Sequence, residues 1–103
     1  MSVLLEFAMF PTDKGESVST YVSRIIKMID ESGESYQLTP MGTIVETQNL
    51  QQALELVHKA YMLLEPDCKR IYSSLKLDIR QGPEGRLAGK ILSIEEKIGS
   101  VKK

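Results

Sequence analysis

The chain has 103 residues, the size of one small domain, so we expect a single domain spanning residues 1–103. Thirteen basic residues balance fourteen acidic ones, and the charges alternate along the chain without forming a block. Because no long basic run is available to follow a phosphate backbone, the composition argues against nucleic acid as a partner.

The single cysteine and the apolar segments indicate where the protein works. Cys68 cannot form an internal disulfide and points to a reducing compartment, and the acidic residues around it favour an unreactive thiol. The N-terminus has no basic stretch, and Glu6 interrupts its apolar run, so we expect no signal peptide. No apolar segment approaches the roughly 20 residues of a membrane helix. We therefore expect a cytoplasmic protein with no membrane partner.

The first segments are predicted to form a strand and a helix. Residues 3–10 are rich in apolar side chains and end at Pro11, which is typical of a strand. Ser17 is expected to cap the following helix, because its hydroxyl can accept from the free amides of the first turn. Gly33 is expected to end this helix. Apolar side chains recur between these two residues at helical spacing, at Val18, Val22, Ile25 and Ile29.

A hairpin is predicted next. Residues 36–38 and 43–47 each have the composition of a short strand. The sequence Thr39-Pro40-Met41-Gly42 between them has a proline at the second position, as tight turns often do. We expect Gly42 to adopt a positive φ, which glycine tolerates without steric cost.

The second half is predicted to form a helix, a strand and a last helix. Asn49 can cap the first of these helices with Gln52 as its capping-box partner, and Pro66 is expected to end it. Residues 71–80 alternate between apolar and polar side chains, as in a strand with two different faces. The residues Gly82-Pro83-Glu84-Gly85 break this strand. The apolar stripes of the two helices are Leu50, Leu54, Val57, Tyr61 and Leu64, and then Leu87, Ile91, Ile94 and Ile98.

The order of these segments predicts the fold class. Strand, helix, strand, strand, helix, strand is the ferredoxin-like arrangement of an α+β protein, here followed by an extra C-terminal helix. We therefore expect a four-stranded antiparallel sheet with two helices on one face.

The face of the sheet away from the helices is expected to be mixed in character. Alternation places four large apolar groups beside charged ones on this outer face: Leu4, Phe10, Ile44 and Tyr72 beside Glu6, Glu46, Lys76, Asp78 and Arg80. Such a face is either an ordinary solvated surface or a contact between subunits, and grouped apolar side chains favour the second. We expect a homo-oligomer, a tetramer, assembled through this face.

Residues that could support catalysis are scarce. His58 is the only histidine and has no partner at metal-ligand spacing, so we expect neither a metal nor a cofactor. No serine is accompanied by a base in a recognisable motif, and no phosphate-binding loop is present, so we expect no enzymatic activity. Glu6 and Glu46 should lie on neighbouring strands. They could do acid–base chemistry, pair with Lys76 or Arg80, or accept hydrogen bonds from a ligand.

Several motifs resemble those of the small cytoplasmic thiamine-binding-protein family. The most specific is Pro40-Met41-Gly42-Thr43 followed by Glu46, although Thr47 stands where that family usually has glycine. The other matching stretches, in order along nearly the whole chain, are Glu6-Phe7 through Pro11, Lys14 through Ser19 with Tyr21-Val22, Ser32-Gly33, Ile71 through Arg80, Gly89-Lys90 and Ser93 through Lys97.

The resemblance implies a ferredoxin-like fold, dimers or homotetramers, and binding of thiamine or its hydroxymethylpyrimidine part as a carrier or sensor. The alternative is a regulatory or assembly module that binds another small metabolite or none. Thiamine requires hydrogen-bonding partners for its aminopyrimidine edge and an apolar wall for its rings. The candidate ligand-binding residues are the carboxylates Glu6 and Glu46, the hydroxyls Ser19 and Thr43, and the aromatic rings Phe10 and Tyr72.

Overall fold

The computed structural model describes residues 1–82 and 85–102 and has the predicted ferredoxin-like α+β fold. Pro83 and Glu84, two of the residues expected to end the last strand, lie outside the described residues, as does Lys103. The elements follow one another as β1 (Ser2–Pro11), α1 (Ser19–Ser32), β2 (Ser35–Thr39), β3 (Gly42–Thr47), α2 (Leu50–Leu64), β4 (Ile71–Arg80) and α3 (Arg86–Ile98).

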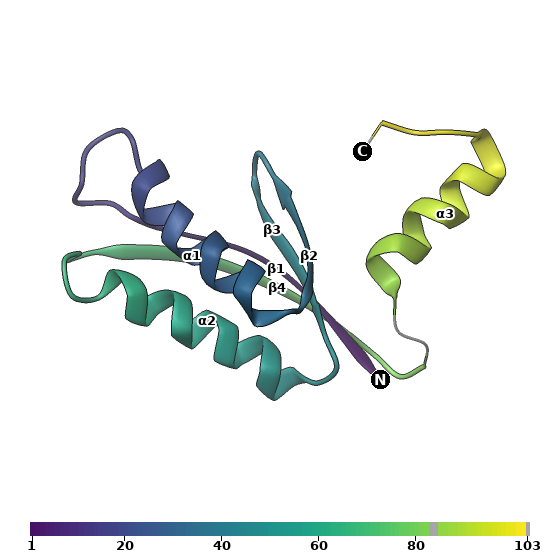
Figure 1. Ribbon diagram of the computed structural model, residues 1–103, viewed down its shortest axis with the longest axis horizontal. Helices are drawn as coiled ribbons and strands as arrows, with labels where there is room; N and C mark the ends of the chain where they lie inside the picture. Colours follow the sequence, from purple (N-terminus) through teal and green to yellow (C-terminus); the bar gives the residue numbers. More distant parts are fainter. Residues whose placement is uncertain (83–84, 103) are drawn as a thin grey trace.

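The four strands form one antiparallel sheet in the order β2-β3-β1-β4. Helices α1 and α2 cover one face of it, as expected (Figure 1). The strand register places Leu5 beside Val45 and Leu77, and Phe7 beside Thr43 and Leu75. These side chains share the face toward the helices, so Glu6, Ile44 and Lys76 share the outer face.

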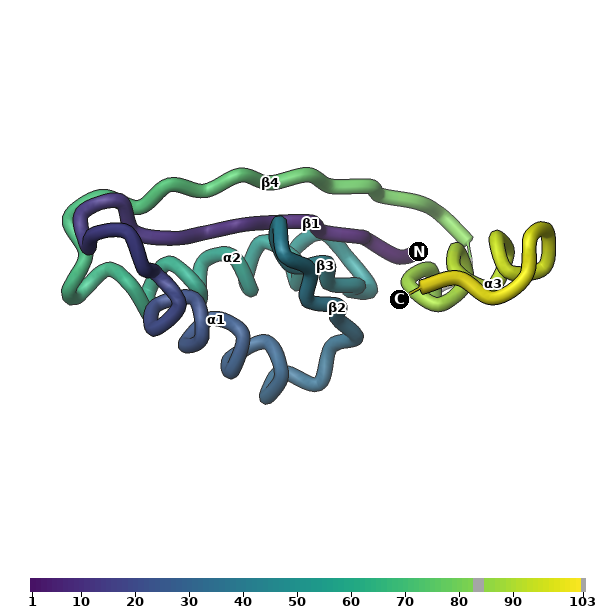
Figure 2. Tube along the Cα trace, turned by 90° about the horizontal axis from the view of Figure 1, so that it is seen from above, coloured from purple at the N-terminus to yellow at the C-terminus, as the bar shows by residue number. Residues whose placement is uncertain are grey.

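The core lies between the sheet and the two helices. Its buried apolar side chains come from β1, α1, β3 and α2: Val3, Leu5, Phe7, Met9, Ile25, Ile29, Val45, Ala53, Leu56, Ala60 and Leu64. β4 contributes none of these fully buried groups, because it is an edge strand that lies beyond the cover of the helices. Figure 2 shows β4 at the margin of the molecule, with α1 and α2 on one side of the β1–β4 pair.

The start of α1 differs from the expectation. The helix begins at Ser19 with Val18 as its N-cap residue, and no side chain caps it, so the prediction that Ser17 caps it was wrong. The carbonyl of Val18 accepts from the amides of Tyr21 and Val22 instead. Val18 and Val22 both line the apolar surface that faces the β2–β3 hairpin, so the first turn of α1 follows these apolar residues rather than the Ser17 hydroxyl. Its end is as predicted, with Gly33 at φ 80°.

The apolar seam of α2 also differs from the predicted stripe. The fully buried residues are Ala53, Leu56, Ala60 and Leu64, whereas Leu54 and Tyr61 of the predicted stripe are exposed. The small alanines lie against the sheet because they allow the helix to approach it closely. Leu54 and Tyr61 therefore project from the flank of the helix, whereas Leu64 of the predicted stripe is buried as expected.

The caps of α2 match the prediction in part. The side chain of Asn49 accepts from the amide of Gln52 at 2.9 Å, as expected. Gln52 accepts from the amide of Gln48 rather than from that of Asn49, so the reciprocal bond of the capping box forms one residue earlier. The helix ends before Pro66, as predicted.

Helix α3 stands apart from the rest of the molecule. It extends beyond the end of the strands, and the structure has an elongated outline of 46 × 29 × 21 Å (Figures 1 and 2). No residue of α3 is buried, and its apolar side chains Leu92, Ile94 and Ile98 are exposed. In the described part of the chain, no helix is long and apolar enough to cross a membrane.

Candidate functional site

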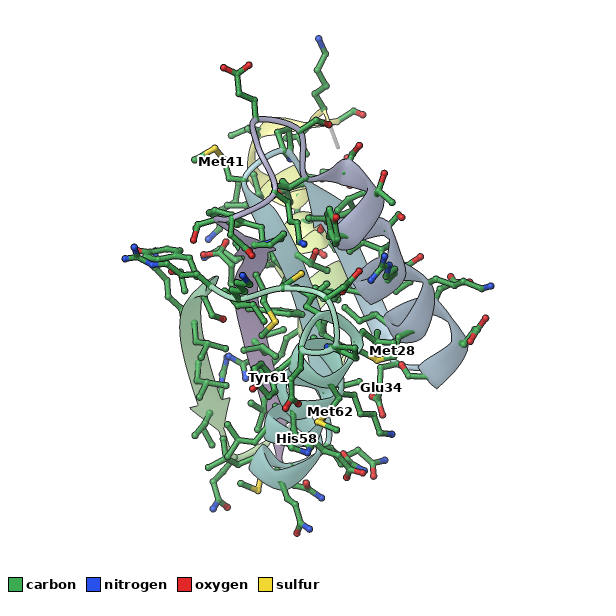
Figure 3. The ribbon with its side chains drawn as sticks, turned by 90° about the vertical axis from the view of Figure 1, so that its left-hand side faces the viewer. Met28, Glu34, Met41, His58, Tyr61 and Met62 are labelled. Atoms are coloured by element: carbon green, nitrogen blue, oxygen red, sulfur yellow. The ribbon has the colours of Figure 1, made fainter. Side chains whose placement is uncertain are left out.

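A small apolar groove lies between the first turns of α1, the end of β1 and the β2–β3 hairpin. Its volume is about 240 Å³. The hairpin turn forms one wall with Leu38, Pro40 and Met41, and α1 forms the opposite wall with Val18 and Val22. Met41 projects at the tip of the hairpin (Figure 3). None of the described residues that line this groove is charged.

Close packing of the hairpin on β1 shapes the floor of the groove. Gly42 lies directly over the backbone of Phe7, and a Cβ atom at Gly42 would be 2.9 Å from the Phe7 carbonyl oxygen. The φ of Gly42 is not positive, so the expectation of a left-handed glycine in this turn was wrong. Glycine is needed there because any side chain would collide with β1.

The turn itself is held by Thr39. Its hydroxyl accepts from the amides of Met41 and Gly42 at 3.2 and 3.1 Å and donates to the carbonyl of Gly42 at 2.9 Å. These bonds close the turn without a positive φ at Pro40 or Met41. The groove wall is therefore preformed, as in most small-molecule sites.

Thr43 supplies the available polar group of this groove. It lines the groove and is 5% exposed, and its hydroxyl has no hydrogen-bond partner among the described residues. No fully buried side-chain oxygen or nitrogen of the described residues lacks a partner, so the Thr43 hydroxyl must reach the open space of the groove. An accessible hydroxyl on an apolar wall is suited to fix the orientation of a small ring by one hydrogen bond.

Two other predicted site residues lie at or beside the groove. Phe10 lines it, and its ring lies 5.7 Å from that of Tyr72, tilted by 39°. Tyr72 is 58% exposed on the outer face and touches the site through Phe10. Ser19 is exposed at the first residue of α1, next to Val18 of the groove wall.

The two predicted carboxylates are elsewhere. Glu6 lies on the outer face and pairs with Lys76 at 3.7 Å, with both side chains at least half exposed. Glu46 is 8% exposed and accepts from the amides of Gly85, Arg86 and Leu87 at 2.8, 3.1 and 3.4 Å. It therefore holds the start of α3, and the structure shows neither of its expected ion pairs, with Lys76 or with Arg80. Thr43 and Glu46 lie on opposite faces of the sheet, because they are three residues apart on one strand.

Arg86 anchors α3 together with Glu46, and the sequence reasoning missed it. Its guanidinium donates to the carbonyl and hydroxyl of Ser2 at 3.1 and 3.2 Å, to the carbonyl of Asp78 at 3.1 Å, and to the Asp78 carboxylate. The side chain is only 11% exposed. A larger hollow of about 430 Å³ lies beside it, but Arg86 is already engaged there by Asp78.

Neither a metal site nor a reactive thiol is found among residues 1–82 and 85–102. In the described part of the chain, no three His, Cys, Asp or Glu side chains lie close enough to hold a metal ion. Burial raises the pKa of the Cys68 thiol, and the neighbouring charge of Asp67 raises it further. His58 lies just past the middle of α2, away from the groove (Figure 3).

A model of the family described as thiamine-binding protein matches residues 5–95. The chain belongs to this family. A relative, the UPF0045 protein MJ1052 of Methanocaldococcus jannaschii, is 32% identical over 94 residues, which are 91% of this chain and 93% of that protein. A second, from Methanothermobacter thermautotrophicus, is 31% identical over 83 residues, which are 80% of this chain and 84% of that protein.

Solved structures of other proteins show the same fold as this chain. The crystal structure of hypothetical protein MJ1052 superposes with a TM-score of 0.81 at 32% identity, covering 92% of this chain and 97% of that one. A Thermotoga maritima protein described as a "putative thiamine biosynthesis/salvage protein" superposes with a TM-score of 0.72 at 23% identity, covering 95% of this chain and 96% of that one. The prediction of the family is confirmed, and so is that of the fold.

Proposed function

We propose that the protein binds the hydroxymethylpyrimidine part of thiamine in the groove between α1 and the β2–β3 hairpin, as a cytoplasmic carrier or sensor without catalytic activity. The observation that carries this proposal is Thr43, whose side chain is almost buried and whose hydroxyl faces the apolar groove with no hydrogen-bond partner among residues 1–82 and 85–102. The family description supports thiamine as the source of the ligand.

The composition of the groove favours the pyrimidine over the whole vitamin. A pyrimidine ring is flat and neutral, and it suits walls made by Val18, Val22 and Phe10. The thiazolium ring of thiamine is a cation, and no described residue lining the groove carries a compensating charge. Thr43 would donate to a ring nitrogen of the pyrimidine, and the thiazolium would remain at the open mouth.

Calorimetric titration of hydroxymethylpyrimidine and of thiamine tests this proposal. We expect both to bind the native chain, with thiamine gaining little over the pyrimidine. Thr43→Val keeps the shape of the side chain and removes the hydroxyl, so its affinity should fall by about 0.5–1.5 kcal/mol, the net value of one hydrogen bond. Thr20→Val, on the exposed surface of α1, is the matched control and should bind as the native chain does. Equal affinities of Thr43→Val and the native chain would contradict the proposal.

A second candidate function is that of an assembly or regulatory module. It is favoured by the apolar groups that the single chain leaves uncovered, above all those of α3. We also propose that the chain forms a tetramer through the outer face of the sheet, where the tilted rings of Phe10 and Tyr72 lie 5.7 Å apart. Light scattering after gel filtration tests it: Tyr72→Lys should lower the mass relative to the native chain, and an unchanged mass would argue against that interface.

A further inference from the structure

The larger hollow beside α3 shares no lining residue with the groove of the proposed function. It lies between the end of β4 and the first turns of α3, the helix that leads away from that end (Figure 1). Its volume of about 430 Å³ falls within the range of small-molecule sites, roughly 300–1,000 Å³. The lining residues that matter for its chemistry are Asp78, Arg80, Arg86, Gly89, Lys90 and Ser93.

Positive charge predominates in this hollow. Among the described residues that line it, Arg80, Arg86 and Lys90 are cations and only Asp78 is an anion, which leaves a formal excess of two positive charges. The whole chain has a formal net charge of −1, so the excess is a local feature. Within residues 1–82 and 85–102, neither Arg80 nor Lys90 forms an ion pair. Both cations are therefore available to a ligand.

Arg86 is held in place on the wall of the hollow. Its guanidinium donates to Ser2 and to both the carbonyl and the carboxylate of Asp78, and its side chain is 11% exposed. A guanidinium that is already fixed loses little further freedom when an anion binds beside it. The backbone amides at the start of α3 are not available, because the Glu46 carboxylate accepts from them. The charge for a ligand must come from the side chains.

Gly89 keeps the α3 wall of the hollow low. It lies inside α3 without a positive φ, and a Cβ atom there would meet nothing within 4 Å. Neither the backbone conformation nor the packing requires glycine, although glycine is unfavourable inside a helix. Ser93 follows one turn later on the same side of the helix, and it is also small. Together the two residues leave room for a ligand beside the helix backbone.

We propose that the larger hollow binds a phosphate dianion, either the free ion or its ester with a small organic molecule. A dianion matches the excess of two positive charges, which the single charge of a carboxylate would leave half balanced. Arg80 donates to phosphate oxygens through two N–H groups, and Lys90 acts as a point charge. The Ser93 hydroxyl donates to a further oxygen. This site goes beyond pyrimidine binding and does not depend on it.

Nuclear magnetic resonance titration with inorganic phosphate and with glycerol 3-phosphate tests the site at constant ionic strength. Near about pH 8 both probes are mainly dianions. We expect saturable amide shifts at Arg80, Gly89, Lys90 and Ser93, and at least about tenfold weaker binding of acetate, a monoanion. Tighter binding of the ester would place its organic part in the hollow, and equal binding of the two probes would assign the site to the free ion. No shift at these residues with either probe at millimolar concentration, or acetate binding as tightly as phosphate, would overturn the proposal.

Charge variants test which cations bind the phosphate. Arg80→Gln and Lys90→Gln should each weaken the affinity for phosphate by about tenfold, the loss expected for one charged hydrogen bond. The matched controls are Arg70→Gln and Lys97→Gln, because each removes an exposed cation that does not line the hollow, and both should bind phosphate as the native chain does. Equal weakening by the controls would show diffuse attraction and overturn the proposal.

Gly89→Leu tests occupancy of the hollow without changing its charge. Leucine favours the helix and fills the space beside it, so the variant should fold and should bind both phosphate probes at least about tenfold more weakly. Unchanged phosphate affinity in Gly89→Leu would overturn the proposed position of the ligand. Pyrimidine affinity should be native in Gly89→Leu, because Gly89 does not line the groove, so a failure of the phosphate site leaves the proposed function standing.

Discussion

At the scale of single residues, Gly42 is needed for contact rather than for turn conformation. Adding a Cβ there brings it to 2.9 Å from the Phe7 carbonyl oxygen, so β3 must shift away from β1. Gly42→Ala should therefore lower the free energy of unfolding by about 1–3 kcal/mol, the usual cost of overpacking. Urea denaturation measures this loss.

Gly89→Ala is the control for this substitution. A Cβ at Gly89 meets nothing within 4 Å, and the residue lies inside α3 without a positive φ. Alanine should favour the helix there by about 0.8–1 kcal/mol. If Gly42→Ala left the denaturation midpoint at the native value, the close approach of the hairpin to β1 would be wrong, and with it the preformed wall of the groove.

The Cys68 thiol should react slowly. Its pKa is raised first by burial and then by the charge of Asp67, so little thiolate is present near pH 8. Asp67→Asn should lower this pKa and increase the rate of labelling by a disulfide reagent. Glu65→Gln, a nearby carboxylate that does not act on the thiol, should label at the native rate. Faster labelling of Glu65→Gln than of Asp67→Asn would contradict this account.

At the scale of the elements, the β3–α3 junction depends on Glu46. Its carboxylate is almost buried and accepts hydrogen bonds from three backbone amides at the start of α3. Glu46→Gln should lower stability by about 1.5–3 kcal/mol, the range for charged hydrogen bonds, and should speed amide exchange in α3. Pyrimidine affinity should be unchanged, because Glu46 does not line the groove.

Glu6→Gln is the matched control for the α3 junction. Glu6 is half exposed and pairs with an exposed lysine, so its loss should cost less than about 1 kcal/mol. Glu46→Gln could instead bind the pyrimidine more weakly while its melting curve and the amide exchange of α3 stay unchanged. That result would contradict the structural role and make Glu46 a ligand-binding group.

The sequence predicted the elements well because local signals define them. Signals between neighbours in the chain define the alternation of residues 71–80, the left-handed conformation of Gly33 and the cap by Asn49. The errors arose where tertiary contact decides. Ala60 rather than Tyr61 is buried against the sheet, and the carbonyl of Val18 rather than the hydroxyl of Ser17 bonds the first amides of α1.

The candidate site was predicted only in part for the same reason. Thr43 and Phe10 were identified, and the Pro-Met-Gly-Thr motif indicated the hairpin that forms the wall. The role of Glu46 could not be seen, because it depends on α3 folding back from 40 residues away to the end of β3. Arg86 was missed because its partners Ser2 and Asp78 meet it only in the folded chain.

At the scale of the whole molecule, the ligand groove and the free edge of β4 are separate. The groove lies at the hairpin end of the sheet, and the free edge of β4 lies along its margin. The groove is built within one chain from α1, β1, β2 and β3, so ligand binding does not require a second copy.

Nuclear magnetic resonance of the native chain titrated with hydroxymethylpyrimidine tests the location of the ligand most directly. The proposed groove predicts that the largest amide shifts fall on the hairpin turn and the first turns of α1, including Thr39, Gly42, Thr43 and Val22. Shifts confined to Arg86, Lys90 and their neighbours would place the ligand in the larger hollow beside α3 and contradict the account. An unchanged spectrum at millimolar ligand would contradict pyrimidine binding altogether.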